Sequence, residues 1–292
     1  RQALGARQQG EGQAGPGRSQ GSRKDPHVTP AFCAAACLAA APASTLGAWE
    51  PDVAAARAYA AQRPGAISFA VRTDGRFWGH RTTRAVPAAS VLKAMLLVAY
   101  LRRGDVRGRP LRSADRRLLA PMVRRSDNAT ATRVRGIVGD AGLYRLARAA
   151  RMQRFETAPI WGLSRIDARD QTRFFLHIDR LVPRRHRAYA MTLLRTVVAS
   201  QRWGVGRATP RGWRSYFKGG WGSGSGAVDH QVALLRRGDL RVSVAIMTTG
   251  NGSHAAGKRT LEGVARRLVR GLEDVIPPAD PAPAGAAPPA SS

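Results

Sequence analysis

Two lysines stand out in a chain that otherwise uses arginine. Lysine and arginine together number 48, and only four of these residues are lysines. Lys93 follows Ser90 at the spacing Ser-x-x-Lys, and Lys218 opens the run Lys-Gly-Gly-Trp. A desolvated lysine can give up its proton, whereas arginine cannot do so in a protein. The pattern indicates that a titratable or compact amine is needed at these two positions, as in catalysis by an activated serine hydroxyl.

Ser90 and Lys93 are three residues apart at the expected start of an apolar helix. This spacing places both side chains on one helix face, within hydrogen-bonding reach. Burial against Met95, Leu96 and Leu97 would disfavour the ammonium form and make Lys93 a base for the serine. The helix N-terminus would also help to stabilise an oxyanion. The alternative is an ordinary capping serine with a surface lysine, because Ser-x-x-Lys often occurs by chance.

Two further short motifs follow along the chain. The tripeptide Ser126-Asp127-Asn128 lies between two apolar helical stretches, where it could equally be a helix N-cap. The run Lys218-Gly219-Gly220 ends an aromatic strand, and its glycines would let a substrate lie along the strand edge. A plain exit from the strand into a loop is the alternative. A phosphate-binding loop is not favoured, since no Gly-Lys-Ser/Thr follows.

Taken together and in this order, the three motifs resemble those of the class A β-lactamase-like, penicillin-binding serine hydrolase family. The resemblance spans roughly Trp49 to Arg270 and implies an α/β sandwich with a helical lobe and an active site in the cleft between them. By motif match, the resemblance implies that Ser90 is the nucleophile, that Lys93 is its base and that Ser126 shuttles a proton to the leaving nitrogen. It implies that Asn128 binds the substrate amide carbonyl and that Lys218 orients Ser126 and the substrate carboxylate. The substrate would lie along Gly219, Gly220 and Trp221, and the backbone N–H groups of Ser90 and Trp221 would form the oxyanion hole.

The chain departs from this family pattern in three places. Gly219 stands where the family commonly has a threonine, so a hydroxyl that contacts the substrate carboxylate is missing. The short stretch between Ser90 and Ser126 indicates a reduced helical lobe. No Glu-Pro-x-Leu-Asn pattern precedes Arg169-Asp170, where the family carries the glutamate that positions hydrolytic water. Glu156 is the only carboxylate near that place, and we interpret it as a surface residue. Slow deacylation is therefore expected.

The elements that must position these residues follow from periodicity and turn signals. Strands alternate with period two, and helices carry longer apolar stretches. The order predicts an antiparallel sheet flanked by terminal helices, with an all-helical lobe inserted between its strands, in the α/β (α+β sandwich) class. The expected helices are 53–62, 89–101, 116–124, 129–138, 141–152, 167–181, 184–200 and 261–275. The expected strands are 67–71, 77–78, 213–217, 227–235 and 240–247.

Composition divides the chain into three parts. Residues 1–47 read as a disordered N-terminus with a leader-like apolar stretch, 48–275 as the hydrolase domain, and 276–292 as a Pro/Ala-rich tail. Cys33 and Cys37 both lie in the leader-like part, so the catalytic region has no thiol for a disulfide or a nucleophile. We expect export with cleavage near Ala43. A lipid anchor and a transmembrane span are not favoured.

The formal net charge of +29 raises the question of partners. The arginines are spread as short pairs, with no long run and no interleaved aromatic residues, which argues against nucleic acid. A solvated basic surface is the favoured interpretation, and attraction to an anionic cell-wall polymer or lipid layer is the alternative. We interpret His230 and His254 as structural. No His/Asp/Glu spacing predicts a metal site, and no cofactor is expected.

The expectation from sequence is thus a secreted or cell-envelope serine acyl hydrolase of the β-lactamase type, acting on a β-lactam or related amide bond. A D-Ala-D-Ala carboxypeptidase or transpeptidase would share the same motifs and would take a peptidoglycan-derived peptide. A catalytically weak member that binds cell-wall material is the non-enzyme alternative. The oligomeric state is left open.

Overall fold

The computed structural model describes residues 46–222, 224 and 226–275. The expected leader with its cleavage near Ala43, and the expected tail, lie outside these residues. The α-helices are α1 Val53–Ala61, α2 Leu92–Leu101, α3 Gly104–Arg107, α4 Ser113–Arg124, α5 Asn128–Ala149, α6 Ala168–Leu176, α7 Ile178–Leu181, α8 Arg184–Arg195, α9 Val205–Ala208 and α10 His254–Leu268. The strands are β1 Ala66–Arg72, β2 Phe77–His80, β3 Val86–Pro87, β4 Arg165–Ile166, β5 Arg214–Gly222, β6 Val228–Arg237 and β7 Leu240–Thr249. Three short 3-10 turns are η1 Ala89–Val91, η2 Trp161–Leu163 and η3 Ala199–Gln201.

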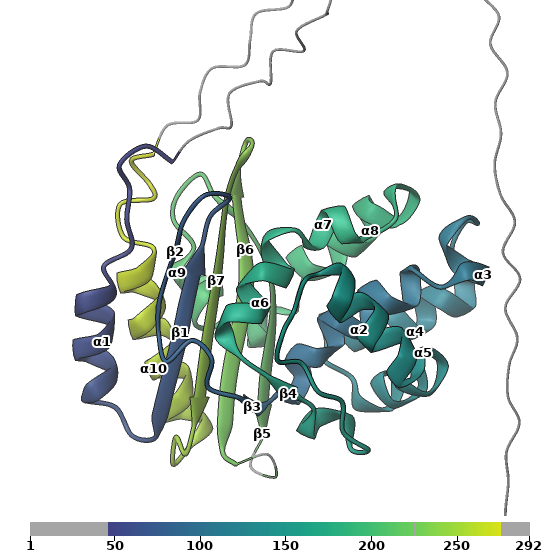
Figure 1. Cartoon of the computed structure of the whole chain (residues 1–292), viewed down its shortest axis with the longest axis horizontal. Coiled ribbons are helices and arrows are strands. Elements are labelled where there is room, and N and C mark those ends of the chain that lie inside the picture. Colours follow the sequence, from purple (N-terminus) through teal and green to yellow (C-terminus); the bar gives the residue numbers. More distant parts are fainter. Residues whose placement is uncertain (1–45, 223, 225, 276–292) are drawn as a thin grey trace, which may run out of the picture. The chain divides into compact units, whose positions relative to one another are not determined.

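Five strands form one antiparallel sheet in the order β2-β1-β7-β6-β5. Helices α1 and α10 pack against each other and cover one face, while α6 and the helical lobe lie on the other (Figure 1). The lobe is inserted between β2 and β5 in the sequence. The predicted α/β architecture is therefore confirmed. Strand β5 lies at one edge of the sheet, so one side of its backbone is left without a partner strand.

Alternation along the inner strands separates two hydrophobic cores. On β7, Val244 and Ile246 join the core beneath α1 and α10, whereas Ala245 and Met247 join the core of the helical lobe. Successive side chains of a strand point to opposite faces, so this division follows directly from the period of two. Both faces of β7 are covered, which is why nearly all of its residues are buried.

Helix α2 forms the centre of the lobe. All ten of its residues are buried, Lys93 included, as expected for a helix that is apolar on every side. Helix α5 lies beside it and is interrupted at Gly139, whose φ of 65° breaks the helical path. The two helices predicted over 129–138 and 141–152 correspond to the two halves of α5.

Several predicted helix ends are wrong. The last helix was predicted over 261–275 but begins at His254, because the Ser253 side chain caps it by accepting from the Ala256 N–H. The helix predicted over 167–181 breaks into α6 and α7 at His177, and the one predicted to reach Ser200 stops at Arg195. Capping and tertiary contacts determine such ends more than apolar periodicity does.

Among the described residues, no helix combines the length and the apolar character that crossing a bilayer requires.

Candidate active site

Ser90 lies in the turn η1, immediately before α2, and its side chain is half-buried. The preceding Ala89 has a φ of 44°, a strained conformation for a residue with a side chain. A side-chain carbon on Gly220 would lie 2.8 Å from the Ser90 nitrogen, so only glycine lets β5 approach the turn so closely. The close packing of β5 on η1 thus determines where the Ser90 backbone N–H lies relative to that strand.

Lys93 forms its side-chain hydrogen bonds with the Ser126-Asp127-Asn128 motif. Its Nζ donates to the Ser126 carbonyl, to Ser126 Oγ at 3.2 Å and to Asn128 Oδ1 at 2.7 Å. The described residues show no hydrogen bond between Ser90 and Lys93, although the spacing predicted reach between them. Burial lowers the pKa of Lys93 to about 7, against a smaller opposite effect from Asp127. Lys93 is therefore an amine that can exchange its proton near neutral pH.

Lys218 donates to the same serine hydroxyl as Lys93 does. Its Nζ donates to Ser126 Oγ at 3.1 Å and to the carbonyl of Gly219 at 2.8 Å. Burial lowers the pKa of Lys218 well below its usual range, and the nearby Lys93 lowers it further. Two amines that share one hydroxyl disfavour double protonation, so a proton can move between them through Ser126.

Ser126 itself is held in an uncommon conformation, with a φ of 60°. The next residue, Asp127, caps α5 by accepting from the backbone N–H and the hydroxyl of Thr130. The motif therefore includes the helix cap that was the alternative interpretation. Asn128 begins the helix with its Oδ1 held by Lys93, and its NH₂ group has no hydrogen bond to the residues that the structure describes, so it can donate to another molecule.

Strand β5 carries the rest of the predicted site. A side-chain carbon on Gly219 would lie 3.1 Å from the Trp203 ring, whereas that on Gly220 would face Ser90. A threonine at this position, which the family commonly has, would therefore require the Trp203 ring to shift by a few tenths of an ångström. Trp221 is half-buried, and its ring stacks on His254 with centroids 5.7 Å apart. Gly220 thus faces the nucleophile side of β5, and Gly219 faces Trp203.

Both histidines have structural contacts that fit their expected role. His230 Nδ1 accepts from the Thr248 N–H at 3.1 Å, and its Nε2 lies 2.9 Å from the carbonyl of Pro87. This pairing requires the neutral ring, and burial lowers the pKa of His230 to about 4. His254 Nδ1 pairs with Asp229 at 2.6 Å. No local signal in the sequence indicates that His230 holds the carbonyl of Pro87, three residues before Ser90.

The segment between α5 and α6 carries Glu156, which the sequence singled out, and Trp161, which it did not. Glu156 is exposed, which agrees with its interpretation as a surface carboxylate, and its backbone pairs with that of Arg165. Trp161, which sequence analysis overlooked, lies over Lys93 with 5.0 Å between Nζ and the ring centroid. Its indole N–H donates to Thr132 Oγ1 at 3.1 Å. The apolar run around Trp161, so close to the family's usual glutamate position, was the signal that could have found it.

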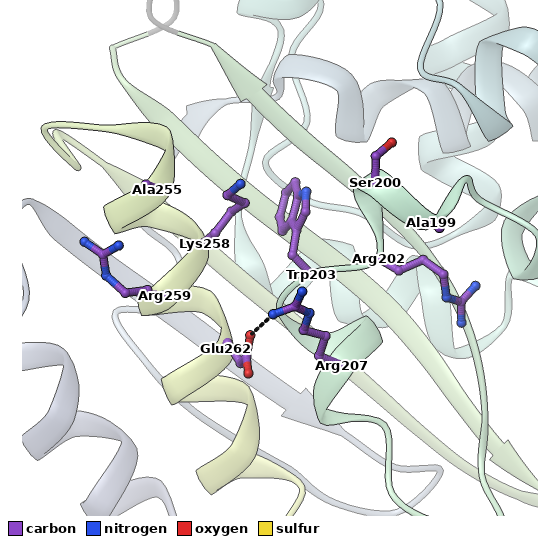
Figure 2. Close-up of a pocket in the computed structure, with 9 residues that line it drawn as sticks. All are labelled: Ala199, Ser200, Arg202, Trp203, Arg207, Ala255, Lys258, Arg259 and Glu262. Carbon is purple, nitrogen blue, oxygen red and sulfur yellow. Dashed lines mark ion pairs between the residues drawn. The ribbon is translucent and has the colours of Figure 1, made fainter.

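A separate cavity of about 350 Å³ lies between α10 and the segment 199–207 (Figure 2). Trp203 lines it together with Lys258, and Arg207 pairs with Glu262 at 3.8 Å. None of the predicted catalytic residues lines this cavity. Trp203 lines this cavity and also packs against Gly219 of β5, but Lys93, Ser126 and Lys218 do not line the cavity.

Structural comparison shows which known folds the chain resembles. A β-lactamase from Sphaerobacter thermophilus is 20% identical with a TM-score of 0.64, and the match covers 78% of this chain and 98% of that one. PBP-A is 16% identical with a TM-score of 0.63, over 76% of this chain and 96% of that one. A class A β-lactamase representative from Bacteroides cellulosilyticus is 11% identical with a TM-score of 0.66, over 77% and 100%. These likenesses show the fold.

Sequence comparison adds the family. No curated protein sequence matches the chain significantly. A profile described as "Beta-lactamase enzyme family" matches residues 109–272, which is more than half of the chain. The matched part includes the motifs at Ser126 and Lys218, whereas Ser90 and Lys93 lie before it. With this match, the shared fold and the motif order, the chain belongs to the β-lactamase enzyme family and is a serine hydrolase.

Proposed function

We propose that the protein forms an acyl-enzyme at Ser90 with β-lactams or related amides. The observation that carries this proposal is the hydroxyl of Ser126, which accepts from both Lys93 at 3.2 Å and Lys218 at 3.1 Å. A hydroxyl between two depressed-pKa amines is suited to pass a proton from one amine to a leaving nitrogen.

The proposed acylation begins with neutral Lys93. It takes the proton of the Ser90 hydroxyl as Oγ attacks the carbonyl carbon, and the C–N bond breaks as Ser126 delivers a proton to the nitrogen. The oxyanion is stabilised by the backbone N–H groups of Ser90 and Trp221. Close packing of Gly220 on the turn that holds Ser90 supports this pairing.

In the proposed complex, the free NH₂ group of Asn128 donates to the substrate amide carbonyl. Lys218 orients Ser126 and, by gaining a proton, binds the substrate carboxylate. A carboxylate beside Lys218 would raise the pKa of this amine again, so charge would develop only when substrate is present. An extended substrate would lie along the edge of β5 that has no partner strand, beside Gly219 and Gly220.

Deacylation in this proposal is slow. Lys93 is influenced by only one carboxylate among the described residues, Asp127, and that group is occupied in capping α5. Glu156 is exposed. A D-Ala-D-Ala carboxypeptidase or transpeptidase is the alternative function, favoured by this same lack of a carboxylate at the place for activating water. Both functions fit an extracytoplasmic enzyme, which we propose as its location.

Intact-mass analysis after incubation with penicillin tests the proposal. We expect one adduct per chain, located on Ser90 by peptide mapping, and none on the Ser90→Ala variant. Ser200→Ala is the matched control, because Ser200 is exposed and lines the separate cavity of Figure 2. An adduct that persists in Ser90→Ala, or none in the wild type with any acylating β-lactam, would refute the assignment of the nucleophile.

The broad basic surface supports a second proposed property, contact with an anionic cell-wall polymer. The net charge of +29 would create an attractive field around the whole molecule. Such attraction would weaken with salt, because exposed charges are screened beyond about 10 Å at 0.1 M ionic strength.

A further inference from the structure

The segment from Glu156 to Arg165 forms a closed loop beside the nucleophile. The backbones of these two residues exchange two hydrogen bonds, of 3.2 and 2.8 Å. The Ala88 N–H donates to the carbonyl of Ser164 at 2.7 Å, which ties the loop to the chain two residues before Ser90. Turn η2 in this loop packs against η1, the turn that holds Ser90. The loop is thus fastened at its base and beside the catalytic turn.

Trp161 is the residue by which this loop reaches the active site. Its ring lies over Nζ of Lys93, and its indole N–H is fixed by Thr132 on α5. The two neighbouring large apolar side chains face solvent, since Ile160 is 67% exposed and Leu163 is 38% exposed. Of the three, Trp161 alone turns inward, so its placement is specific and not a general collapse of the loop.

Hydrolysis of an acyl-enzyme needs space as well as a base. Water must attack the ester carbonyl of acyl-Ser90 and give a proton to a base, while the bond to Ser90 Oγ breaks and this oxygen regains a proton. Lys93, one helical turn after Ser90 and the base of the proposed acylation, is the base that we assign to this step as well, whereas the Lys218 amine contacts Ser126 and the carbonyl of Gly219. A water activated by Lys93 must touch Nζ, and the indole covers one side of that atom. An aromatic face offers water no strong hydrogen bond in compensation.

We propose that the ring of Trp161 keeps water from Lys93 and thereby sets the lifetime of the acyl-enzyme. This inference rests on the proposed acylation of Ser90 and goes beyond it by naming the residue that limits turnover. Trp161 acts by occupying space beside the base, so its truncation should change deacylation much more than acylation.

The test measures the lifetime of the penicillin adduct on the full-length wild type and on the variants Trp161→Ala, Trp161→Phe and Ile160→Ala. After free penicillin has been removed, the loss of the adduct is monitored over time by intact-mass analysis. We expect Trp161→Ala to lose its adduct about tenfold faster or more, with an acylation rate within about threefold of wild type. Trp161→Phe keeps a ring over Lys93 but not the indole N–H, so its adduct should last nearly as long as in the wild type. Ile160→Ala is the matched control, because it truncates an exposed neighbour in the same loop.

Two results would overturn the inference. The first is an unchanged adduct lifetime in Trp161→Ala. The second is an equal loss of lifetime in Trp161→Phe, which would assign the effect to the hydrogen bond with Thr132. If Trp161→Ala does not fold, Trp161→Leu keeps part of the apolar packing and leaves part of the space open, so it should show a smaller acceleration in the same direction. Absence of any adduct on the wild type would instead refute the acylation of Ser90, so the two failures can be told apart.

Discussion

Lys93 illustrates how a single side chain acquires chemistry through its surroundings. All three protons of its ammonium form have acceptors, namely the carbonyl and Oγ of Ser126 and Oδ1 of Asn128. Burial opposes the charge that these acceptors favour, and the resulting pKa is about 7. The amine is therefore held between its two protonation states near neutral pH. This balance explains why an arginine, which keeps its proton, would not serve at this position.

Replacing Lys93 by arginine should lower the acylation rate about a hundredfold or more, the usual contribution of a positioned base. Lys258→Arg, the same change on α10 outside the catalytic cluster, should acylate normally. In the wild type the rate should rise with pH through about 7 and level off above it, because the neutral amine is the active form. Stopped-flow measurements with a chromogenic cephalosporin at several pH values check both. Normal acylation by Lys93→Arg would make Lys93 a structural charge.

Strand β5 and turn η1 form the contact that positions the nucleophile. More than 120 residues separate the two elements in the sequence, but in the fold they are in contact. A side-chain carbon built on Gly220 would lie only 2.8 Å from the Ser90 nitrogen. His230 strengthens the same region from β6 by holding the carbonyl of Pro87. The edge of the sheet, the catalytic turn and the start of α2 thus behave as one structural unit.

Gly220→Ala should separate β5 from this turn. Overpacking of this kind typically costs about 1–3 kcal/mol in stability, and acylation should fall further because Ser90 is displaced. Gly108→Ala is the control, since Gly108 has open space around it and a φ of −96°, so it should be neutral in both respects. Thermal unfolding and adduct formation by mass spectrometry provide the two measurements. If Gly220→Ala acylates like the wild type, the turn η1 can move away from β5 without loss of Ser90 reactivity.

The whole molecule joins two hydrophobic cores through one sheet, and buried polar contacts fasten the layers. Arg241 on β7 is buried and pairs with Asp179 of α7 at 2.5 Å, which links the sheet to the helical layer. His230 links the sheet to the chain before the nucleophile in its neutral form. Removing one partner from such a buried pair leaves the other without compensation, so these links matter more than exposed ion pairs do.

His230 makes the stability of the whole fold depend on pH. Its pKa is lowered to about 4 in the folded protein, whereas the ordinary value is 6.5. Its contribution is complete above about pH 6.5 and is lost as pH falls towards 4, because only the unfolded chain takes up the proton in that range. The loss should approach about 3 kcal/mol. Urea unfolding of the wild type and of His230→Gln between pH 7 and pH 4 checks this. If the free energy of unfolding depended on pH in the same way in the wild type and in His230→Gln, the prediction would be wrong.

Much of this organisation could be read from local sequence signals. The three motifs and their order indicated the family, and the order of helices and strands indicated an antiparallel sheet flanked by terminal helices, with an inserted helical lobe. The turn that joins β1 to β2 and the break in the helix at Gly139 also lay within reach, because turn and helix-breaking residues act over a few positions. Capping contacts were less visible, so α10 was predicted to begin seven residues too late.

Tertiary structure alone decided how the chemical groups meet. Ser126 and Lys218 are 92 residues apart, and their contact depends on β5 packing against the helical lobe. The pKa of Lys93 depends on its burial, which no spacing of residues expresses. Sequence spacing predicted hydrogen-bonding reach between Lys93 and Ser90, but in the folded protein the Lys93 amine donates to Ser126 and Asn128. Trp161 has no motif at all. Its role arises from a closed loop that lies over Lys93, because long-range packing brings together side chains whose types local sequence can only suggest.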